Sequence, residues 1–96
     1  MWILQGAPFS FRLAPGAVKT VGRAPRADFI LDVALVSRLH CRLSAEEDGL
    51  EVVDLSSTNG TFVNDKRIDR AVLGKGDRLR VGRVELTIGR GSVGEG

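Results

Sequence analysis

Turn-forming residues interrupt the chain every few positions, and this feature limits most strongly the folds that it can adopt. Combinations of Gly, Pro, Asn and Asp occur at residues 6–8, 14–16, 48–49, 64–66 and 74–77. Between two of these turns, Phe9, Phe11 and Leu13 alternate with polar residues, which is the period-two pattern of a half-buried strand. Many short strands at close spacing predict an all-β sandwich or barrel.

The apolar positions change parity near the end of the chain. Leu79 and Val81 occupy odd positions, whereas Leu86 and Ile88 occupy even positions. One strand in a single register cannot bury all four side chains on the same face. We therefore predict a turn at residues 82–83, with a separate strand on each side of it.

The segment 29–47 is compatible with two structures. Ile30 and Val33 lie at helical spacing, and the segment is rich in Ala, Leu, Arg and Glu, which favour helices. Cys41 and Leu43 instead alternate with polar residues, as in a strand. The pattern alone leaves open both a helix and a strand, loop and strand.

Three hydroxyl-bearing residues precede an Asn-Gly pair within the stretch 54–64. The hydroxyls belong to Ser56, Ser57 and Thr58. Residues 59–60 predict a tight hairpin, because Asn and Gly both tolerate the positive φ that such a turn needs. Turn chemistry explains most of this stretch. The alternative is a loop built to hold an oxyanion or a peptide backbone.

Composition excludes several classes of function. The 96 residues suffice for one domain with a single core, and a net charge of +2 is too small to indicate a general nucleic-acid-binding protein. The single cysteine, Cys41, permits no internal disulfide and favours a reducing compartment. One cysteine and one histidine form no zinc-ligand set. We expect no metal, no cofactor and no membrane association, and a monomeric domain located inside the cell, in the cytoplasm or nucleus.

The last residues have little to bury. Residues 89–96 include four glycines and few apolar side chains. We expect a folded domain over residues 1–89, followed at 90–96 by a flexible tail or the start of a linker.

Three motifs in fixed order carry a resemblance to a known family. They are Gly-Arg at 22–23, Ser-Arg-Leu-His at 37–40 and Ser-Thr-Asn-Gly-Thr at 57–61. Together they resemble the forkhead-associated (FHA) family over nearly the whole chain. The resemblance implies a SMAD/FHA-like β-sandwich of two twisted, mostly antiparallel sheets, and it favours strands within 29–47. It also implies that loops at one end of the sandwich bind phosphothreonine peptides, and that the partner protein is phosphorylated by a Ser/Thr kinase.

The resemblance implies that seven residues bind the phosphopeptide: Arg23, Ser37, Arg38, Ser57, Thr58, Asn59 and Asn64. A phosphothreonine carries nearly two negative charges and three acceptor oxygens, so its capture needs donors and positive charge. The planar fork of Arg23 suits two phosphate oxygens, and Ser37 offers a compact hydroxyl donor. Thr58 is expected to donate to phosphate or to receive the threonine methyl group, and Asn59 to hold the peptide main chain.

Four further residues are implied to shape this site. Leu35 lies where some family members select the third residue after the phosphothreonine, which indicates an apolar preference there. Gly22, His40 and Gly60 are expected to be structural. The ring of His40 is expected to tie the loop of Ser37 to the loop that follows residue 54.

Two other classes of protein compete with a phosphopeptide-binding signalling module. One is an FHA fold that mediates interaction or oligomerisation without recognising phosphate. The other is a small basic β-barrel that binds nucleic acid, which is disfavoured because Phe9 and Phe11 are predicted to be buried and the chain has no tyrosine. An enzyme is not expected, because one histidine and one cysteine supply no nucleophile with a plausible base and orienting acid. Direct nucleic-acid binding is likewise not expected.

Overall fold

The computed structural model describes residues 1–91, and within them it contains strands and no helix. The strands are β1 (Trp2–Gly6), β2 (Phe9–Leu13), β3 (Val18–Gly22), β4 (Phe29–Ile30), β5 (Cys41–Ala45), β6 (Leu50–Asp54), β7 (Thr61–Val63), β8 (Lys66–Ile68), β9 (Arg70–Leu73), β10 (Arg78–Val81) and β11 (Val84–Arg90). This part of the chain therefore holds no helix that could cross a membrane.

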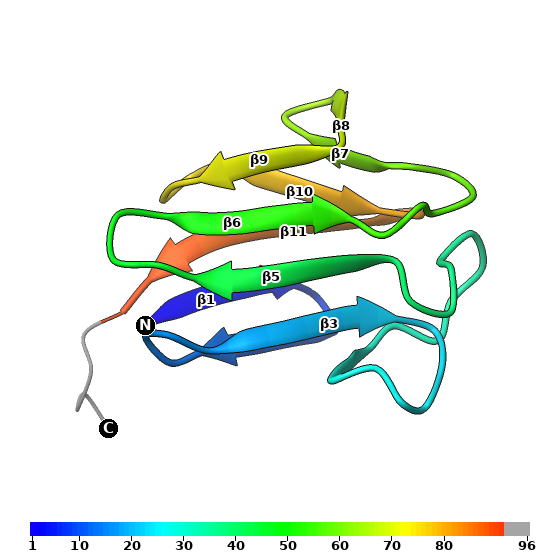
Figure 1. Cartoon of the computed structure of the whole chain (residues 1–96), viewed down its shortest axis with the longest axis horizontal. Helices are drawn as coiled ribbons and strands as arrows, with labels where there is room; N and C mark the ends of the chain where they lie inside the picture. The colour runs from blue at the N-terminus through cyan, green and yellow to red at the C-terminus, as the bar shows by residue number, and fades with distance from the viewer. Residues whose placement is uncertain (92–96) are drawn as a thin grey trace.

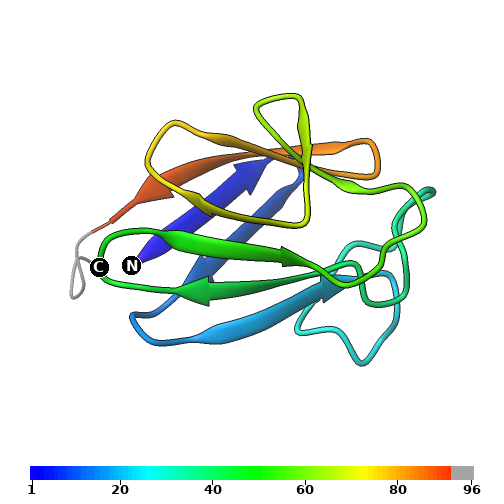
Figure 2. The same ribbon diagram turned by 45° about the horizontal axis from the view of Figure 1, so that its top comes forward.

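The strands form two sheets that pack face to face (Figures 1 and 2). The six-stranded sheet has the order β2-β1-β11-β10-β7-β8, and the five-stranded sheet has the order β4-β3-β5-β6-β9. The pairings are antiparallel except for the short parallel contact between β3 and β4. The predicted β-sandwich is confirmed.

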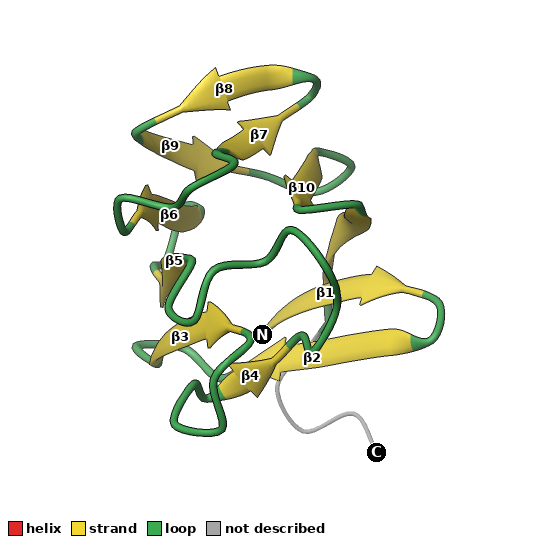
Figure 3. Cartoon of the chain, turned by 90° about the vertical axis from the view of Figure 1, so that its right-hand side faces the viewer, coloured by secondary structure: helices red, strands yellow, loops and turns green. Residues whose placement is uncertain are grey.

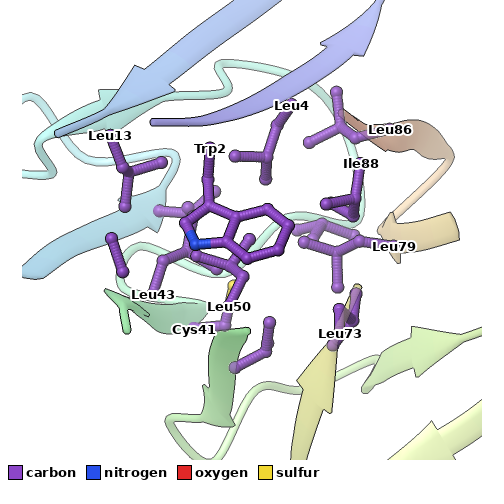
Figure 4. Close-up of a cluster of buried hydrophobic side chains, with 14 of the residues drawn as sticks. Trp2, Leu4, Leu13, Cys41, Leu43, Leu50, Leu73, Leu79, Leu86 and Ile88 are labelled. Atoms are coloured by element: carbon purple, nitrogen blue, oxygen red, sulfur yellow. The ribbon is translucent and has the colours of Figure 1, made fainter. Parts of the chain in front are cut away.

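The core lies between the sheets and is dominated by leucine. Figure 4 shows the indole ring of Trp2 surrounded by aliphatic side chains, among them Leu4, Leu50 and Ile88, each at most 1% exposed. The indole N–H donates to the Glu46 carbonyl oxygen at 3.1 Å, which satisfies the polar end of this large apolar group. Burial of these side chains supplies the main favourable free energy of folding.

The aromatic side chains at one edge are only partly covered. Phe9 and Phe11, predicted to be buried, are half-buried and pack against the core. Phe11 stacks on Phe29 of the other sheet with ring centroids 4.6 Å apart. This contact closes the edge of the sandwich formed by β2 and β4.

The predicted turn at 82–83 is confirmed. It joins β10 to β11, with Val81 paired to Val84. Leu79 and Leu86 are then directly opposite each other and fully buried. The change of parity is the result of a two-residue hairpin, which returns the second strand with its apolar side chains on the same face.

The helical interpretation of segment 29–47 is wrong, and the strand, loop and strand are confirmed. Cys41 and Leu43 point into the core from β5, where period-two alternation matches the burial. Leu31 and Val36 are buried from the intervening loop, so their spacing reflects where that loop covers the core. Helix propensity is outweighed here by burial in the sandwich.

The hairpin predicted at Asn59-Gly60 is also wrong. Strands β6 and β7 belong to different sheets, so the loop 55–60 crosses from one sheet to the other. Gly60 has a positive φ of 89°, but Asn59 does not share it, so the pair cannot form the two-residue hairpin turn. That geometry occurs at the predicted turn 64–66, where Asn64 and Asp65 have φ values of 49° and 70° and join β7 to β8.

The two ends of the sandwich differ. The start of β1 and the end of β11 lie on one side in Figure 1, whereas the connections after β3, β4 and β6 and the β10–β11 turn lie on the opposite side. Strand β11 extends to Arg90, and the N–H of Gly91 donates to the Met1 carbonyl oxygen at 2.9 Å. Most of the tail predicted at 90–96 lies outside the described residues.

Candidate functional site

A pocket opens at the end of the sandwich that carries these connections, which faces the viewer in Figure 3. Its walls come from three separate segments of the chain. The lining residues are Arg23, Asp32, Val33, Ala34, Leu35, Val36, Ser37, Thr58 and Asn59. Five of the predicted site residues are therefore brought together, namely Arg23, Leu35, Ser37, Thr58 and Asn59. The volume of about 420 Å³ is within the range of clefts that hold a ligand group.

Arg23 is held by the loop that precedes β5. Its backbone N–H donates to the Ser37 carbonyl oxygen at 2.9 Å, and its Nε donates to the Val36 carbonyl oxygen at 3.1 Å. The side chain is exposed. Because Nε is used by the protein, the two terminal nitrogens are presented as the ends of a fixed fork, which suits two oxygens of one anion.

The residue before Arg23 must be small. A Cβ at Gly22 would lie 2.0 Å from the carbonyl oxygen of Arg38, a backbone atom that cannot turn aside. Gly22 is buried, and its lack of a side chain allows the end of β3 to approach the loop before β5. This close approach brings Arg23 next to Ser37.

Ser37 and Thr58 join two walls of the pocket. The backbone N–H of Thr58 donates to Ser37 Oγ at 3.0 Å. Since the Ser37 hydroxyl accepts this bond, its own proton can be donated elsewhere. Thr58 is exposed and lines the pocket.

His40 connects the same two loops from beneath. Its ring is fully buried, with Nδ1 accepting from the Ser37 backbone N–H at 3.1 Å and Nε2 placed 2.8 Å from the Gly60 carbonyl oxygen. Since Nδ1 accepts, Nε2 must carry the proton and donate to Gly60, which defines the neutral tautomer. The ring therefore sets the distance between the loops.

Asn59 joins the same two walls at a second point. Its Nδ2 donates to the Leu35 carbonyl oxygen at 3.1 Å, which leaves the amide oxygen as an acceptor. Leu35 has a positive φ of 73° and a side chain that is 44% exposed, so it presents an apolar group at the pocket rim.

Ser57 does not line the pocket. It is buried; its hydroxyl donates to Asp54 Oδ1 and accepts from the Gly60 N–H at 3.0 Å. Both functions of the hydroxyl are thus used within the loop, in contrast to the predicted contact with a phosphopeptide.

Asp54 and Thr61 organise this loop; Thr61 ends the third motif, but the sequence predicts no role for either residue. The Thr61 hydroxyl donates to Asp54 Oδ1 at 2.7 Å, and the Ser57 N–H donates to Oδ2 at 3.1 Å. An Asp three residues before a Ser is a sequence signal for such a local side-chain turn. Burial alone would raise the pKa of Asp54, but the hydrogen bonds from Ser57 and Thr61 outweigh it and hold the pKa below its usual value.

We expect Asp54→Asn to lower the melting temperature at neutral pH by several degrees, because the amide cannot accept all of these bonds. The depressed pKa means that the carboxylate stabilises the fold above its unfolded-state pKa of about 4 and ceases to do so as pH falls through the lower folded value. The difference in melting temperature between wild type and variant should therefore narrow below about pH 4. Thermal melts across pH 2–7 measure this, and a constant difference would contradict it.

Two other predicted binding residues lie outside the pocket. Asn64 is occupied at the start of β10, since its Nδ2 donates to Asp77 Oδ1 at 3.1 Å and its Oδ1 accepts from the Arg78 N–H at 2.9 Å. Arg38 is exposed and lines an adjacent hollow together with Arg23 and Asp32. Arg38 can therefore add positive charge beside the pocket, whereas the side chain of Asn64 stabilises a turn.

The single cysteine, Cys41, is buried and does not line the pocket. Burial, with a smaller contribution from the charge of Asp54, raises the pKa of Cys41 to about 12. Such a thiol remains protonated and is a poor nucleophile. Within residues 1–91, no group of three His, Cys, Asp or Glu side chains is arranged to hold a metal ion.

Comparison with known proteins agrees with this architecture. The family model for the FHA domain matches residues 19–82, which include all three motifs and every residue lining the pocket. The chain belongs to the FHA-domain family.

Relatives and solved structures extend the match. The chain is 39% identical to the ABC transporter ATP-binding/permease protein Rv1747 of Mycobacterium tuberculosis, over 97% of this chain and 11% of that protein. It is 41% identical to the glycogen accumulation regulator GarA of M. tuberculosis strain H37Rv, over 73% of this chain and 43% of that protein. A structure determined for phosphothreonine-dependent FHA domain interactions is 29% identical with a TM-score of 0.86, covering 96% of this chain and 98% of that chain.

Proposed function

We propose that this domain binds phosphothreonine in partner proteins and thereby mediates phosphorylation-dependent protein–protein interaction in signalling. One observation supports the proposal: Arg23, Ser37 and Thr58 line one pocket from three separate segments of the chain. The similar structure that was determined for phosphothreonine-dependent interactions supports the same ligand class.

Each group in the pocket has a chemical role toward such a ligand. Arg23 provides permanent charge and two parallel donors for the phosphate dianion. Ser37 donates its hydroxyl proton to a phosphate oxygen, and Thr58 either donates or packs against the threonine methyl. The free amide oxygen of Asn59 accepts from a peptide N–H while its nitrogen holds Leu35.

The activity proposed is binding without catalysis. The pocket contains donors and one cationic fork, but the buried thiol of Cys41 and the imidazole of His40, which is committed to two loops, are not available to a substrate. We further propose that the isolated domain is monomeric and acts inside the cell on the product of a Ser/Thr kinase.

The role of the whole protein lies beyond the domain. The chain spans 11% of the length of the transporter relative and 43% of the length of the regulator GarA. The matching regions thus belong to a transporter and to a regulator. We propose that in each setting the domain brings its own protein and a phosphorylated partner together.

Titration with matched peptides tests the proposal. The same fluorescent peptide is prepared with phosphothreonine, phosphoserine and unmodified threonine, and its affinity for the 96-residue chain is measured by fluorescence anisotropy. Phosphothreonine should bind tightest and unmodified threonine should show no saturable binding. Equal affinity for the phosphorylated and unmodified peptides would instead favour a phosphate-independent interaction module. An oriented phosphopeptide library then defines the preferred residues after the threonine, including the apolar preference suggested by Leu35.

Ser37→Ala is expected to weaken phosphothreonine binding by about tenfold, the lower end of the effect of one hydrogen bond to a charged acceptor, which contributes roughly 1.5–3 kcal/mol. The variant also removes the acceptor of the Thr58 N–H, a group at the exposed rim that water can satisfy. Ser44→Ala, at a half-buried hydroxyl in β5 outside the pocket lining, is the matched control. An unchanged affinity in Ser37→Ala would remove Ser37 from the phosphate site.

A further inference from the structure

Two exposed arginines beside the pocket have no carboxylate partner within the described residues. Among residues 1–91, ion pairs join Arg70 to Glu51, and Arg78 to Asp65 and Glu85. Arg67 and Arg83 are exposed and take part in no ion pair within this range. Their charges therefore remain available to a ligand.

Arg67 lies on the outer side of the loop 55–60. The Cβ position of Gly60 would be 2.8 Å from Arg67 Nε and 3.1 Å from its Cζ, so the guanidinium rests on this glycine. Gly60 follows directly after Asn59, which lines the pocket. Arg67 of β8 thus adds a positive charge to the flank of one pocket wall.

Arg83 lies beside the opposite wall. The preceding residue, Gly82, packs its backbone against the loop after β4: its Cβ position would be 2.9 Å from Val36 Cγ2 and 3.2 Å from the Ala34 carbonyl oxygen. Val36 and Ala34 both line the pocket. Figure 3 shows this loop crossing the end of the sandwich toward the β10–β11 turn, which carries Arg83.

Few carboxylates lie in the lining of the pocket. Asp32 is the one carboxylate among the lining residues, all of which belong to the described range. Asp54 accepts hydrogen bonds from Ser57 and Thr61, and Asp28 accepts them from Thr20. A bound anionic segment would therefore meet arginines on both flanks and a single carboxylate, Asp32, in the pocket lining.

We propose that Arg67 and Arg83 form two subsites that flank the phosphate pocket and select phosphothreonine within an anionic segment. This inference rests on the proposed function. An extended peptide advances about 3.3 Å per residue, so residues a few positions before and after the phosphothreonine reach beyond the pocket walls on the two sides. The anionic groups can be the carboxylates of Asp and Glu or a second phosphorylated residue, since both offer charged oxygens to a guanidinium.

The test compares phosphothreonine peptides that differ only in their flanks. One peptide carries glutamate at the positions before and after the phosphothreonine, a second carries glutamine there, and a third carries a second phosphothreonine among glutamines. The glutamate peptide should bind the 96-residue chain about tenfold tighter than the glutamine peptide, as expected from two exposed ion pairs. A gain with glutamate assigns carboxylates, and a gain with the second phosphate alone assigns phosphorylated flanks.

Charge-neutral variants connect the preference to the two arginines. Arg67→Gln and Arg83→Gln should each reduce the glutamate-to-glutamine affinity ratio a few-fold, and the double variant should bring it close to one. Arg12→Gln, at an exposed site on the edge strand β2, removes the same charge elsewhere and should leave the ratio unchanged. Thermal melts check that each variant is folded.

Different outcomes overturn different claims. Equal affinity for all three peptides, or an equal reduction of the ratio in Arg12→Gln, would overturn the flanking subsites while phosphothreonine binding stands. Equal binding of phosphorylated and unmodified peptides would overturn the proposed function itself.

Discussion

Arg23→Ala is expected to weaken binding of a phosphothreonine peptide at least about a hundredfold, while the melting temperature stays close to that of the wild type. The two terminal nitrogens offer two charge-assisted hydrogen bonds, each contributing roughly 1.5–3 kcal/mol. Loss of both removes a large share of the approximately 8 kcal/mol that a micromolar complex represents. Stability should change little, because the exposed side chain donates one bond within the protein and the backbone bond to Ser37 is retained.

A matched pair of variants sharpens this experiment. Arg26→Ala removes an exposed arginine from the same connection, outside the pocket lining, and should retain most of the affinity. Arg23→Lys keeps the charge but loses the planar fork, so an intermediate affinity is expected. Near-normal binding by Arg23→Ala in a fluorescence titration would contradict the site. An equal loss in Arg26→Ala would indicate a general charge effect.

His40→Ala is expected to lower the melting temperature by at least about 10 °C. Removing the fully buried ring leaves a cavity and two backbone groups without partners, the N–H of Ser37 and the carbonyl oxygen of Gly60. Such a change costs roughly 3 kcal/mol or more. In a domain of this size, each kcal/mol corresponds to about 4–8 °C in melting temperature. Differential scanning calorimetry measures the shift.

Binding and stability should separate between neighbouring positions. Ser37→Ala should lose affinity with a small change in melting temperature, whereas His40→Ala should lose stability first and affinity as a consequence of displaced loops. A wild-type melting curve for His40→Ala would mean that the ring does not hold the two loops together.

Strand locations could be predicted where local pattern and burial agree. Alternation in Phe9–Leu13 and the change of parity around residues 82–83 each describe a face and a turn, and both match the structure. The Asn-Gly pair at 59–60 misled the prediction, because the same residues serve a hairpin or a loop that changes sheet. The choice depends on which strands β6 and β7 join, and one partner of each, β9 for β6 and β10 for β7, lies beyond the next strand in sequence.

In the candidate site, too, the sequence predicts some residues correctly and leaves the role of others to the tertiary structure. Motif order predicts that Arg23, Ser37 and Thr58 act together, and all three line the pocket, yet Ser57 and Asn64 carry the same kinds of polar group and are engaged within the protein. A hydroxyl or amide has a limited number of hydrogen bonds, and only the folded arrangement determines whether they are made internally or offered to a ligand.

The amino-acid sequence by itself determined the class of fold, the turns at 64–66 and 82–83, and the family to which the three motifs belong. The tertiary structure decided which sheet each strand joins, which hydroxyls face the pocket, and that Arg67 and Arg83 flank it. The physical reason is range: periodicity and turn chemistry act between neighbouring residues. The position of the pocket loops depends instead on contacts between residues far apart in sequence. His40, for example, connects the Ser37 backbone to the carbonyl oxygen of Gly60, twenty residues further along the chain.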